Sequence, residues 1–259
     1  MELEILTCKD RIYSYLGLNP ALQIYCIGDL DNFFFPYTTW YGLYNEGHLK
    51  SLALLYSGMD IPTLLLFQEE DNSFGRELLH LLKPSLPSRF YAHMSPGLMQ
   101  VLGRENILEY YGMNLKMTLK KLPAEINDSN IRRLSPQDMD TVTAFYKTAY
   151  PHNWFDKRML ETGKYFGYFM GESLAGVAGV HVYSAQYRVA ALGNIAVLPA
   201  LRGRQTGFKL TSVLCNDLVQ TTDTIGLNVM SDNAAAIHLY QKAGFEVTGR
   251  YEECFMRLK

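Results

Sequence analysis

Long hydrophobic runs are missing from this chain of 259 residues, and so is an excess of charge of either sign. The apolar run at residues 64–67 is typical of the longest ones, far short of the ~18 residues that a membrane helix needs. Lysine and arginine number 24 against 26 aspartate and glutamate, a net charge of −2 that offers nucleic-acid phosphates no general attraction. The sequence therefore predicts neither a membrane nor a nucleic-acid partner.

Closely spaced cysteine pairs are missing too. None of the four cysteines belongs to a Cys-x-x-Cys motif, which excludes a zinc ribbon and a thioredoxin-type redox site. Scattered thiols in a chain of this size are typical of reduced, buried residues in an intracellular protein. The N-terminus is acidic where a secretory signal is basic. We therefore expect a cytoplasmic protein.

The chain is rich in apolar residues, at 48%, and in aromatic ones, at 13%, which is enough for a sizeable core. Its length suits two domains of ~130 residues each. Pro, Asn, Asp and Ser cluster between residues 120 and 130, which is linker chemistry. We expect an N-terminal domain over residues 1–126 and a C-terminal domain over residues 127–259.

The C-terminal half has the pattern of an α/β domain. Ser135, Pro136 and Asp138 predict a helix start, and the helix runs to about residue 149. Periodicity and turn residues then predict, in order, a helix at 155–161, strands at 165–170, 175–183 and 189–197, a helix around 210–218, a strand at 225–229, a helix at 234–243 and a strand at 251–258.

The N-terminal half repeats this order more loosely. Residues 41–57 can be laid over 166–184, since both contain an aromatic strand, a glycine turn, an aliphatic strand and then Tyr-Ser. Further elements are predicted at 62–68, 74–82, 89–94, 98–102 and 114–119. A duplicated architecture is the interpretation that this favours, and an unrelated α/β cap is the alternative.

The most informative segment joins an apolar strand to a helix and reads Arg202-Gly203-Arg204-Gln205-Thr206-Gly207. Unpaired N–H groups and the helix dipole make such a helix start favourable for an anion, most often a phosphate. Arg202 and Arg204 add charged donors, while Gly203 and Gly207 let the backbone approach an anion closely. An ordinary turn with solvated arginines is the alternative.

A second segment lies downstream at 227–245. Asn233 is placed to cap a helix that begins with three alanines, whose slim surface leaves room for another group, and Gly244 is placed to end it. Tyr240 falls seven residues after Asn233, about two turns along the same face.

Together these segments resemble the motifs of the GNAT superfamily of acyl-CoA-dependent N-acyltransferases, over about residues 130–259. The first is similar to the family's pyrophosphate loop, Arg/Gln-x-x-Gly-x-Gly/Ala, although Gln205 stands where the family has its middle glycine. The second is similar to the family's other acyl-CoA motif and reads Asn233-x-x-Ala236-x-x-x-Tyr240-x-x-x-Gly244-Phe245. The resemblance implies two GNAT-like α/β domains with mixed sheets flanked by helices, of which only the C-terminal one has complete motifs.

The resemblance also implies acetyl-CoA as cosubstrate, no metal, and a role for each matched residue. The loop from Arg202 to Gly207 would hold the pyrophosphate, and Tyr240 would protonate the departing thiolate as the catalytic acid. A core tyrosine is the alternative for Tyr240. The residues that would contact the pantetheine arm are Ile195, Ala196, Val197, Asn233 and Ala236.

The mechanism implied is direct attack of an amine on the thioester, with the N–H of Val197 as a candidate donor to the oxyanion. No cysteine has a recognisable His partner in the local sequence, so we expect no covalent acyl-enzyme. The strand at 189–197 lacks a carboxylate to act as base, and a water relay to solvent is expected instead. Four further residues are candidate bases: His181, Asn194 through a water, Asp232 and Glu253. His181 is also interpreted as a strand histidine whose hydrogen bonds are satisfied.

The N-terminal half has no counterpart of the basic loop. Glu69, Glu70 and Asp71 stand at the equivalent point, where they would repel a pyrophosphate, so a second CoA site is not expected. Two aromatic stretches, at 32–37 and 150–155, are candidates to line an acceptor pocket, with core packing as the alternative.

We therefore predict an N-acetyltransferase for a small-molecule or amino-acid-like amine, present as a monomer or homodimer. One alternative is a longer-chain acyltransferase of the glycine N-acyltransferase type. The other is a non-catalytic acyl-CoA-binding module.

Overall fold

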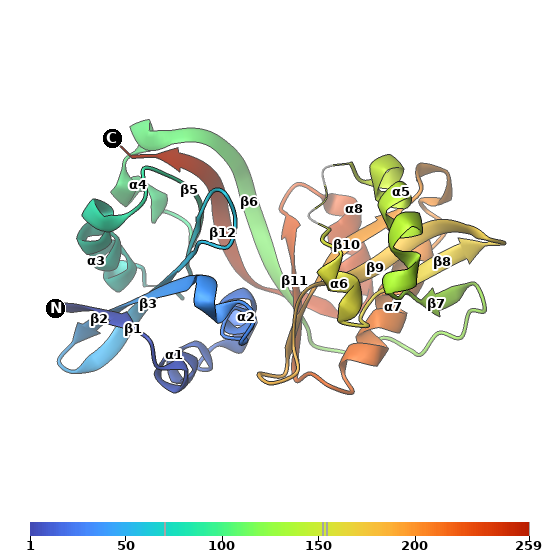
Figure 1. Ribbon diagram of the computed structural model, residues 1–259, viewed down its shortest axis with the longest axis horizontal. Coiled ribbons are helices and arrows are strands. Elements are labelled where there is room, and N and C mark those ends of the chain that lie inside the picture. Colours follow the sequence, from blue (N-terminus) through green and yellow to red (C-terminus); the bar gives the residue numbers. More distant parts are fainter. Residues whose placement is uncertain (70, 152, 154, 259) are drawn as a thin grey trace. The chain divides into compact units, whose positions relative to one another are not determined.

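The computed structural model of the protein describes residues 1–69, 71–151, 153 and 155–258 (Figure 1). The chain divides into two compact units that are interleaved in sequence. Unit 1 holds residues 1–116, 230–232 and the chain from Thr248 onward, and unit 2 holds residues 117–229 and 233–247. Each unit has a mixed sheet flanked by helices, so the predicted α/β class is confirmed.

Unit 1 is built around the strand order β1-β2-β3-β4-β5, in which only β4 and β5 are parallel. Its elements are β1 (Glu2–Leu6), α1 (Lys9–Leu16), α2 (Pro20–Gly28), β2 (Thr38–Asn45), β3 (His48–Tyr56), β4 (Thr63–Leu66), α3 (Ser73–Leu82), β5 (Arg89–Met94) and α4 (Met99–Leu102), with single 3-10 turns at Phe35–Tyr37, Lys83–Ser85 and Arg104–Asn106.

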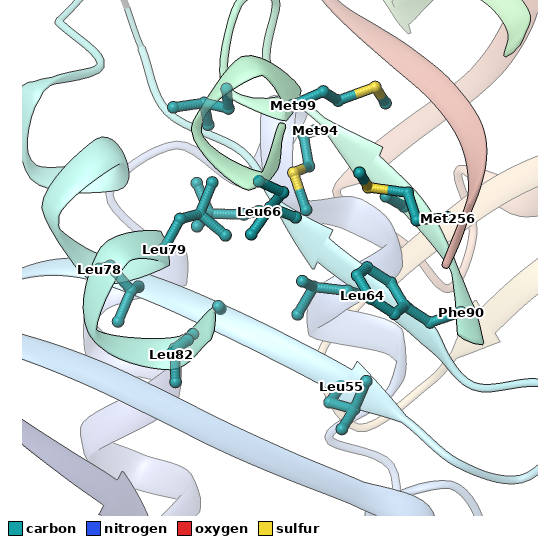
Figure 2. Close-up of a cluster of buried hydrophobic side chains, with 14 of the residues drawn as sticks. Leu55, Leu64, Leu66, Leu78, Leu79, Leu82, Phe90, Met94, Met99 and Met256 are labelled. Carbon is teal, nitrogen blue, oxygen red and sulfur yellow. The ribbon is translucent and has the colours of Figure 1, made fainter. Parts of the chain in front are cut away.

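Two long neighbouring strands, β6 (Ile107–Leu119) and β12 (Phe245–Arg257), contribute residues to both units. In unit 1, β12 pairs antiparallel with β5, from Glu252 opposite Met94 to Arg257 opposite Arg89. This pairing places Cys254 and Met256 in the apolar core of unit 1, where both are fully buried (Figure 2). The last strand of the chain therefore completes the core of the first unit.

Unit 2 has the strand order β11-β10-β9-β8-β7, in which only β10 and β11 are parallel. Its remaining elements are β7 (Ile131–Arg133), a 3-10 turn at Pro136–Asp138, α5 (Met139–Ala149), α6 (Arg158–Glu161), β8 (Phe166–Met170), β9 (Ser173–Ser184), β10 (Val189–Val197), a 3-10 turn at Pro199–Leu201, α7 (Thr206–Leu218), β11 (Thr224–Met230) and α8 (Ala234–Lys242).

Glycines on β9 let other groups pack closely on both faces of the unit 2 sheet. A Cβ at Gly176 would lie 2.9 Å from Leu210 of α7, and a Cβ at Gly179 would lie 2.2 Å from the Tyr165 ring. Because residues an odd number apart on a strand point to opposite faces, α7 and Tyr165 cover different sides. A buried tyrosine thus lies across the sheet from α7.

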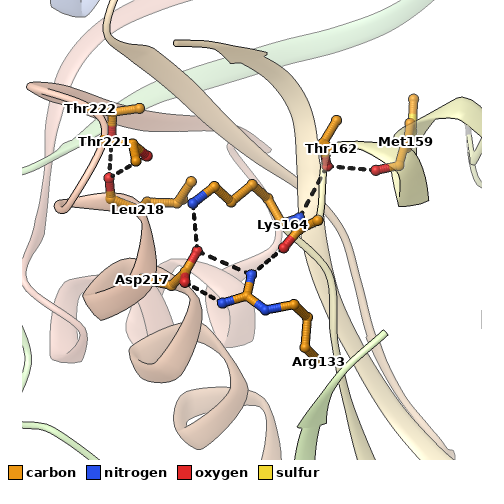
Figure 3. Close-up of polar contacts among 9 residues, drawn as sticks. Arg133, Met159, Thr162, Lys164, Asp217, Leu218, Thr221 and Thr222 are labelled. Atoms are coloured by element: carbon orange, nitrogen blue, oxygen red, sulfur yellow. Dashed lines mark hydrogen bonds and ion pairs between the residues drawn. The ribbon is translucent and has the colours of Figure 1, made fainter. Parts of the chain in front are cut away.

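A polar cluster ties α7 to the N-terminal part of unit 2 (Figure 3). The Asp217 carboxylate accepts hydrogen bonds from Arg133 at 2.5 Å and from the Lys164 ammonium at 2.8 Å. Arg133 also donates to the Gly163 carbonyl. The Lys164 side chain is mostly buried and depends on Asp217 for its counter-charge.

Several predicted boundaries differ from the observed ones. The division after residue 126 does not coincide with the two units, because β12 belongs mostly to unit 1. The helix predicted at 155–161 is shorter, since the Asp156 carboxylate accepts from the Arg158 amide and begins α6 there. The strand predicted at 251–258 begins at Phe245, directly after Gly244 ends α8 at φ 91°.

The sequence interpretation missed β1, α1 and α2, all before residue 41. Within the described ranges, the chain has no helix that combines the length and the apolar character needed to cross a membrane.

Candidate functional site

The pairing between the parallel strands β10 and β11 ends midway along β10. Their pairing runs from Val189 opposite Thr224 to Leu192 opposite Leu227, and in the described chain no register continues it. β10 goes on to Val197, paired only with β9 on its other side. The residues predicted to pair with pantetheine, Ile195, Ala196 and Val197, thus form a strand edge beyond the point where β11 leaves.

The loop after β10 presents backbone donors that lack acceptors. The amides of Gly203 and of residues 205–208 make no hydrogen bond to any described part of the chain, and residues 206–208 are the first turn of α7. Gly203, at φ 75°, and Gln205, at φ 64°, both lie in the left-handed region. Amides gathered at a helix N-terminus, where the dipole is positive, form an anion site.

Arg202 and Arg204 are exposed, and neither forms an ion pair with a described carboxylate. Other arginines of unit 2 behave differently, since Arg133 pairs with Asp217 and Arg188 with Asp223. The loop therefore carries two uncompensated positive charges beside the free amides. Free amides next to uncompensated positive charge are an arrangement that suits an anion.

Gly207 has a packing role that the sequence did not indicate. A Cβ at this position would lie 2.9 Å from Leu239 Cδ1 of α8 and 3.7 Å from Val197 Cγ2. The glycine thus allows α8 to approach the start of α7 closely. By contrast, a Cβ at Gly203 would meet nothing within 4 Å, so space around that residue is open.

Helix α8 begins as predicted. The Asn233 side chain accepts a hydrogen bond from the Ala236 amide at 3.1 Å and caps the helix. No residue of α8 is fully buried, although its first residues are alanines. An apolar, slim helix face left uncovered is a surface that a ligand can contact.

Tyr240 lies on α8 with its ring edge-to-face against Phe245, at a centroid distance of 6.0 Å. Its hydroxyl makes no hydrogen bond to the described residues, so the proton is free to be donated elsewhere. Burial raises the pKa of Tyr240 above its ordinary value, and the nearby Tyr150 and Cys215 raise it further. The phenol therefore stays protonated at neutral pH.

The candidate bases are distributed over both units. Asp232 and Glu253 belong to unit 1, where Glu253 faces His93 at 3.5 Å and accepts from Asn114 at 3.3 Å. His181 and Asn194 belong to unit 2, where burial lowers the pKa of His181 and the Asn194 side chain partly offsets that effect. His181 Nε2 and Asn194 Oδ1 are both buried, and in the described part of the chain neither atom makes a hydrogen bond of standard geometry.

Two tyrosines that the sequence did not single out hold Asn194 in place. Tyr146 donates to the Asn194 carbonyl at 2.6 Å, and Tyr165 accepts from the Asn194 side chain at 3.1 Å. Phe155 packs against both rings, at centroid distances of 5.1 and 5.8 Å. Of the predicted stretch at 150–155, Phe155 thus lies beside this network, whereas His152 and Trp154 lie outside the described residues.

In unit 1, the corresponding ends of the parallel strands β4 and β5 are joined by hydrogen bonds within the chain. After the last pair of β4 and β5, the Ser95 hydroxyl accepts from the Gln68 amide at 2.8 Å and donates to the Gln68 carbonyl at 3.0 Å. The Asp71 carboxylate accepts from the Ser73 amide at 2.8 Å, at the first residue of α3. The chain's own groups thus take the positions that an anion would need, while Glu70 lies outside the described residues. The aromatic stretch at 32–37 also belongs to unit 1.

A family model described as the acetyltransferase (GNAT) family matches residues 131–245. Residues 131–245 are a domain of the GNAT acetyltransferase family. This GNAT domain includes the open strand edge, the loop and Tyr240. A curated relative, an uncharacterized protein of Mycobacterium leprae, is 31% identical over 141 residues, which are 50% of this chain and 38% of that protein's own length.

Solved structures share the fold over nearly the whole chain, beyond the GNAT domain itself. A Drosophila protein has a TM-score of 0.70 at 14% identity, with 99% of this chain and 98% of that one covered. A GNAT-family acetyltransferase from Colwellia psychrerythraea has a TM-score of 0.61 at 15% identity, with 99% and 100% covered. A tandem GNAT protein from the clavulanic acid biosynthesis pathway has a TM-score of 0.55 at 14% identity, with 99% and 98% covered.

Proposed function

We propose that this protein is an N-acetyltransferase that transfers the acetyl group of acetyl-CoA to a primary amine of a small or amino-acid-like molecule. The observation that carries the proposal is the loop from Arg202 to Gly207. Its unbonded amides and its two unpaired guanidinium groups adjoin a free strand edge. This combination suits a ligand with a diphosphate at one end and an amide-containing arm at the other.

The parts of the ligand have matching surfaces in unit 2. The diphosphate binds the amides of Gly203 and residues 205–208, with Arg202 and Arg204 as charged donors. The pantetheine arm, which carries amides of its own, pairs with the edge at residues 195–197 as an added strand would. The uncovered start of α8, at Asn233 and Ala236, lies along the same ligand.

Tyr240 is the acid for the departing thiolate in this proposal. An alkyl thiolate has a pKa of ~8.5 in water, and loss of water around it raises that value as it raises the pKa of Tyr240. Because the phenol is the weaker acid, full proton transfer to a free thiolate is uphill, so Tyr240 acts by donating a hydrogen bond and then its proton as negative charge develops on the sulfur during cleavage of the C–S bond. The Val197 amide, at the end of the same strand edge, is the candidate donor to the tetrahedral oxyanion.

Calorimetry with acetyl-CoA tests the binding part. We expect saturable binding, weakened ~10-fold or more in the double variant Arg202→Gln, Arg204→Gln, since charge-assisted hydrogen bonds are each worth about 1.5–3 kcal/mol. Arg188→Gln, which removes the exposed ion pair to Asp223, is the matched control. Acetyl-pantetheine lacks the diphosphate, so its affinity should be the same for the wild type and the double variant. If the double variant lost as much affinity for acetyl-pantetheine as for acetyl-CoA, the role assigned to the loop would be wrong.

Release of free thiol in the presence of a panel of amines tests the enzymatic part. Acetyl-, butyryl- and benzoyl-CoA in the same assay separate an acetyltransferase from the longer-chain alternative. Binding of acetyl-CoA without thiol release for any amine would favour a non-catalytic acyl-CoA-binding module. We further propose a cytoplasmic protein that acts as a monomer or homodimer, which size-exclusion chromatography with light scattering would test.

A further inference from the structure

Unit 1 contains a cavity of about 890 Å³ that the proposed function does not use. Every residue that lines it belongs to unit 1 and lies outside the GNAT domain of residues 131–245. The lining comes from α1, α2, α3, β3 and β12 and from the segments that follow β4 and β5. A cavity of this size accommodates a small organic molecule.

Two buried glutamines give this cavity hydrogen-bond acceptors. Gln23 and Gln68 both line it, with only 6% and 9% of their surface exposed. The Nε2 atom of each donates to the Phe67 carbonyl, at 3.0 and 3.3 Å. Because a carbonyl can only accept, this contact fixes the orientation of both side-chain amides. The two Oε1 atoms are thus left free, and no donor from the described residues reaches either of them.

Nearby backbone donors are already used by the chain. The Gln68 amide donates to the Ser95 hydroxyl and the Ser73 amide donates to the Asp71 carboxylate, both at 2.8 Å. A phosphate would therefore find these N–H groups occupied. The free acceptors instead favour a ligand whose head group carries several N–H bonds, such as a protonated primary amine.

The rim beside Gln68 is negatively charged. Glu69 is exposed, accepts from the Asn19 side chain at 2.8 Å, and has no ion pair with a described cation. Burial raises the pKa of Tyr15, and the charge of Glu69 raises it further, so this carboxylate lies near the Tyr15 hydroxyl. That hydroxyl in turn accepts from Gln68 Nε2 at 3.3 Å. An ammonium group at the free Oε1 atoms would have a counter-charge close by.

Positive charge is found where β12 lines the cavity. Arg250 is exposed there, and a Cβ at its neighbour Gly249 would lie 3.7 Å from the Lys116 side chain. The Lys116 ammonium is buried over the Phe67 ring, 3.7 Å from its centroid. Burial lowers the pKa of Lys116 to about 8, so it remains mostly charged at neutral pH. Neither these cations nor Lys50, which also lines the cavity, has an ion pair with a described carboxylate.

The rest of the lining is largely apolar. Leu18, Leu22 and Phe74 all contribute to it, and Leu18 is 80% exposed although it is a large apolar residue. A ligand group that covers Leu18 removes this apolar surface from water, which stabilises the complex. The chemistry of the wall therefore favours an aliphatic group on the ligand.

Uncompensated charges of both signs around one small cavity suit a ligand that carries both. We propose that the unit 1 cavity binds a free, zwitterionic amino acid with an apolar side chain. Its ammonium group donates to Gln23 Oε1 and Gln68 Oε1 beside Glu69. Its carboxylate faces the positive charges of Arg250 and Lys116, and its side chain covers the apolar wall.

Calorimetry of the full chain with L-leucine tests the site, and we expect saturable binding. Isocaproate, which lacks the ammonium group, and L-leucinamide, which lacks the carboxylate, should each bind ~10-fold or more weakly. L-Leucinamide also represents the N-terminus of a peptide, so equal affinity for leucine and leucinamide would overturn the choice of a free amino acid. The absence of saturable binding at millimolar leucine would overturn the site altogether.

Variants locate the ligand in the cavity. Gln23→Leu removes one free acceptor, while the Phe67 carbonyl keeps its bond from Gln68, and leucine binding should weaken ~10-fold or more. Glu69→Gln removes only the exposed charge at the rim and should weaken binding about 3-fold. Glu2→Gln, at an exposed carboxylate of β1 outside the cavity, is the matched control and should equal wild type. If Gln23→Leu does not fold, Glu69→Gln decides alone, and wild-type affinity in the folded variants would overturn the proposal.

A further comparison separates this inference from the proposed function. The double variant Arg202→Gln, Arg204→Gln, which we expect to bind acetyl-CoA weakly, should bind leucine as the wild type does. Loss of leucine binding in that variant would overturn the unit 1 site. A wild type that binds leucine but not acetyl-CoA would overturn the proposed function and leave the unit 1 site supported.

Discussion

Gln205 holds a backbone conformation, φ 64°, that costs a residue with a Cβ about 1–2 kcal/mol. Gln205→Gly removes this strain but adds chain entropy to the unfolded state, so we expect a gain in unfolding free energy of no more than about 1 kcal/mol. The exposed side chain stands beside the free amides of the loop, and its removal should also tighten binding of acetyl-CoA. Urea unfolding and calorimetry measure the two effects.

Gly203→Ala provides the matched comparison in the same loop. A Cβ there would meet nothing within 4 Å, so the expected loss of about 1 kcal/mol reflects the backbone strain at φ 75° less the reduced chain entropy of the unfolded state, with no steric contribution. A Gln205→Gly protein less stable than wild type would mean that the glutamine side chain makes a stabilising contact that outweighs the strain.

Tyr240→Phe removes only the hydroxyl that is proposed to protonate the thiolate. Because that hydroxyl has no hydrogen bond to the described residues, the ring packing against Phe245 should survive. We expect kcat to fall ~100-fold, the lower end for loss of a general acid, with little change in the Kd for acetyl-CoA. Stopped-flow turnover and calorimetry provide the two numbers. A large loss of affinity at normal turnover would contradict the assigned role.

How far single residues could be predicted depended on how local their roles are. The cap at Asn233 and the basic loop are local patterns, and the sequence indicated both. The supports of Asn194 were not visible, because Tyr146 and Tyr165 are 48 and 29 residues away from it in sequence. Gly207 was assigned to ligand approach, since nothing in the sequence reveals that Leu239 packs above it.

At the scale of elements, Asp217 of α7 links the helix to β7 and to Lys164. Burial alone raises the pKa of Asp217, but the hydrogen bonds from Arg133 and Lys164 outweigh it and hold the pKa below its ordinary value. Asp217→Asn leaves the mostly buried Lys164 without a counter-charge, so we expect a loss of about 2–4 kcal/mol in unfolding free energy at pH 7. Urea unfolding over a pH series measures it.

The sign of the pH effect follows from the depressed pKa. The stabilising contribution of the Asp217 carboxylate is fully present above its pKa in the unfolded chain, 3.8, and is lost as the pH falls through its lower pKa in the folded protein. The difference in unfolding free energy between wild type and Asp217→Asn should therefore narrow below about pH 4. Asp223→Asn, at an exposed ion pair with Arg188, is the control and should change stability little at any pH. A difference in unfolding free energy that did not narrow as the pH fell below 4 would mean that the charge of Asp217 is not the cause.

Elements with clear periodicity or turn residues were predicted well. The helix around 210–218 and the strands at 89–94 and 189–197 match α7, β5 and β10 closely, because their apolar patterns are long and regular. The first 40 residues carry weaker patterns, and β1, α1 and α2 were missed. The opening between β10 and β11 could not be predicted, since pairing and bulges depend on contacts between distant segments.

At the scale of the molecule, the stability of unit 1 depends on the last strand. Met256 is fully buried in the unit 1 core beside Phe90 and Met94, so Met256→Ala should lower the unfolding free energy of unit 1 by about 2–5 kcal/mol (Figure 2). Trp40, buried in β2, provides a fluorescent probe of that unit in a Trp154→Phe background. Met256→Leu, which conserves volume, should cost less than about 1.5 kcal/mol. An unchanged Trp40 transition in Met256→Ala would contradict the interleaved architecture.

The linear division at residues 126 and 127 was a natural expectation, since a linker-like segment lies there. It differs from the two units because a boundary inferred from composition reflects only neighbours in sequence. The partner of β5, from Glu252 to Arg257, lies more than 150 residues further along the chain. No local signal distinguishes a strand that completes its own unit from one that completes another.

The position of β12 also sets an order of events during synthesis. Cys254 and Met256 emerge from the ribosome only after the whole of unit 2 has been translated, whereas unit 2 receives its last residues, 233–247, earlier. The first unit in sequence is thus the second to be able to fold. Until then β5 presents an unpaired edge, the kind of surface on which strands of other nascent chains add. Slow translation of the codons for the unit 1 part of β12, residues 248–257, would lengthen that interval, and the yield of folded protein should depend on it.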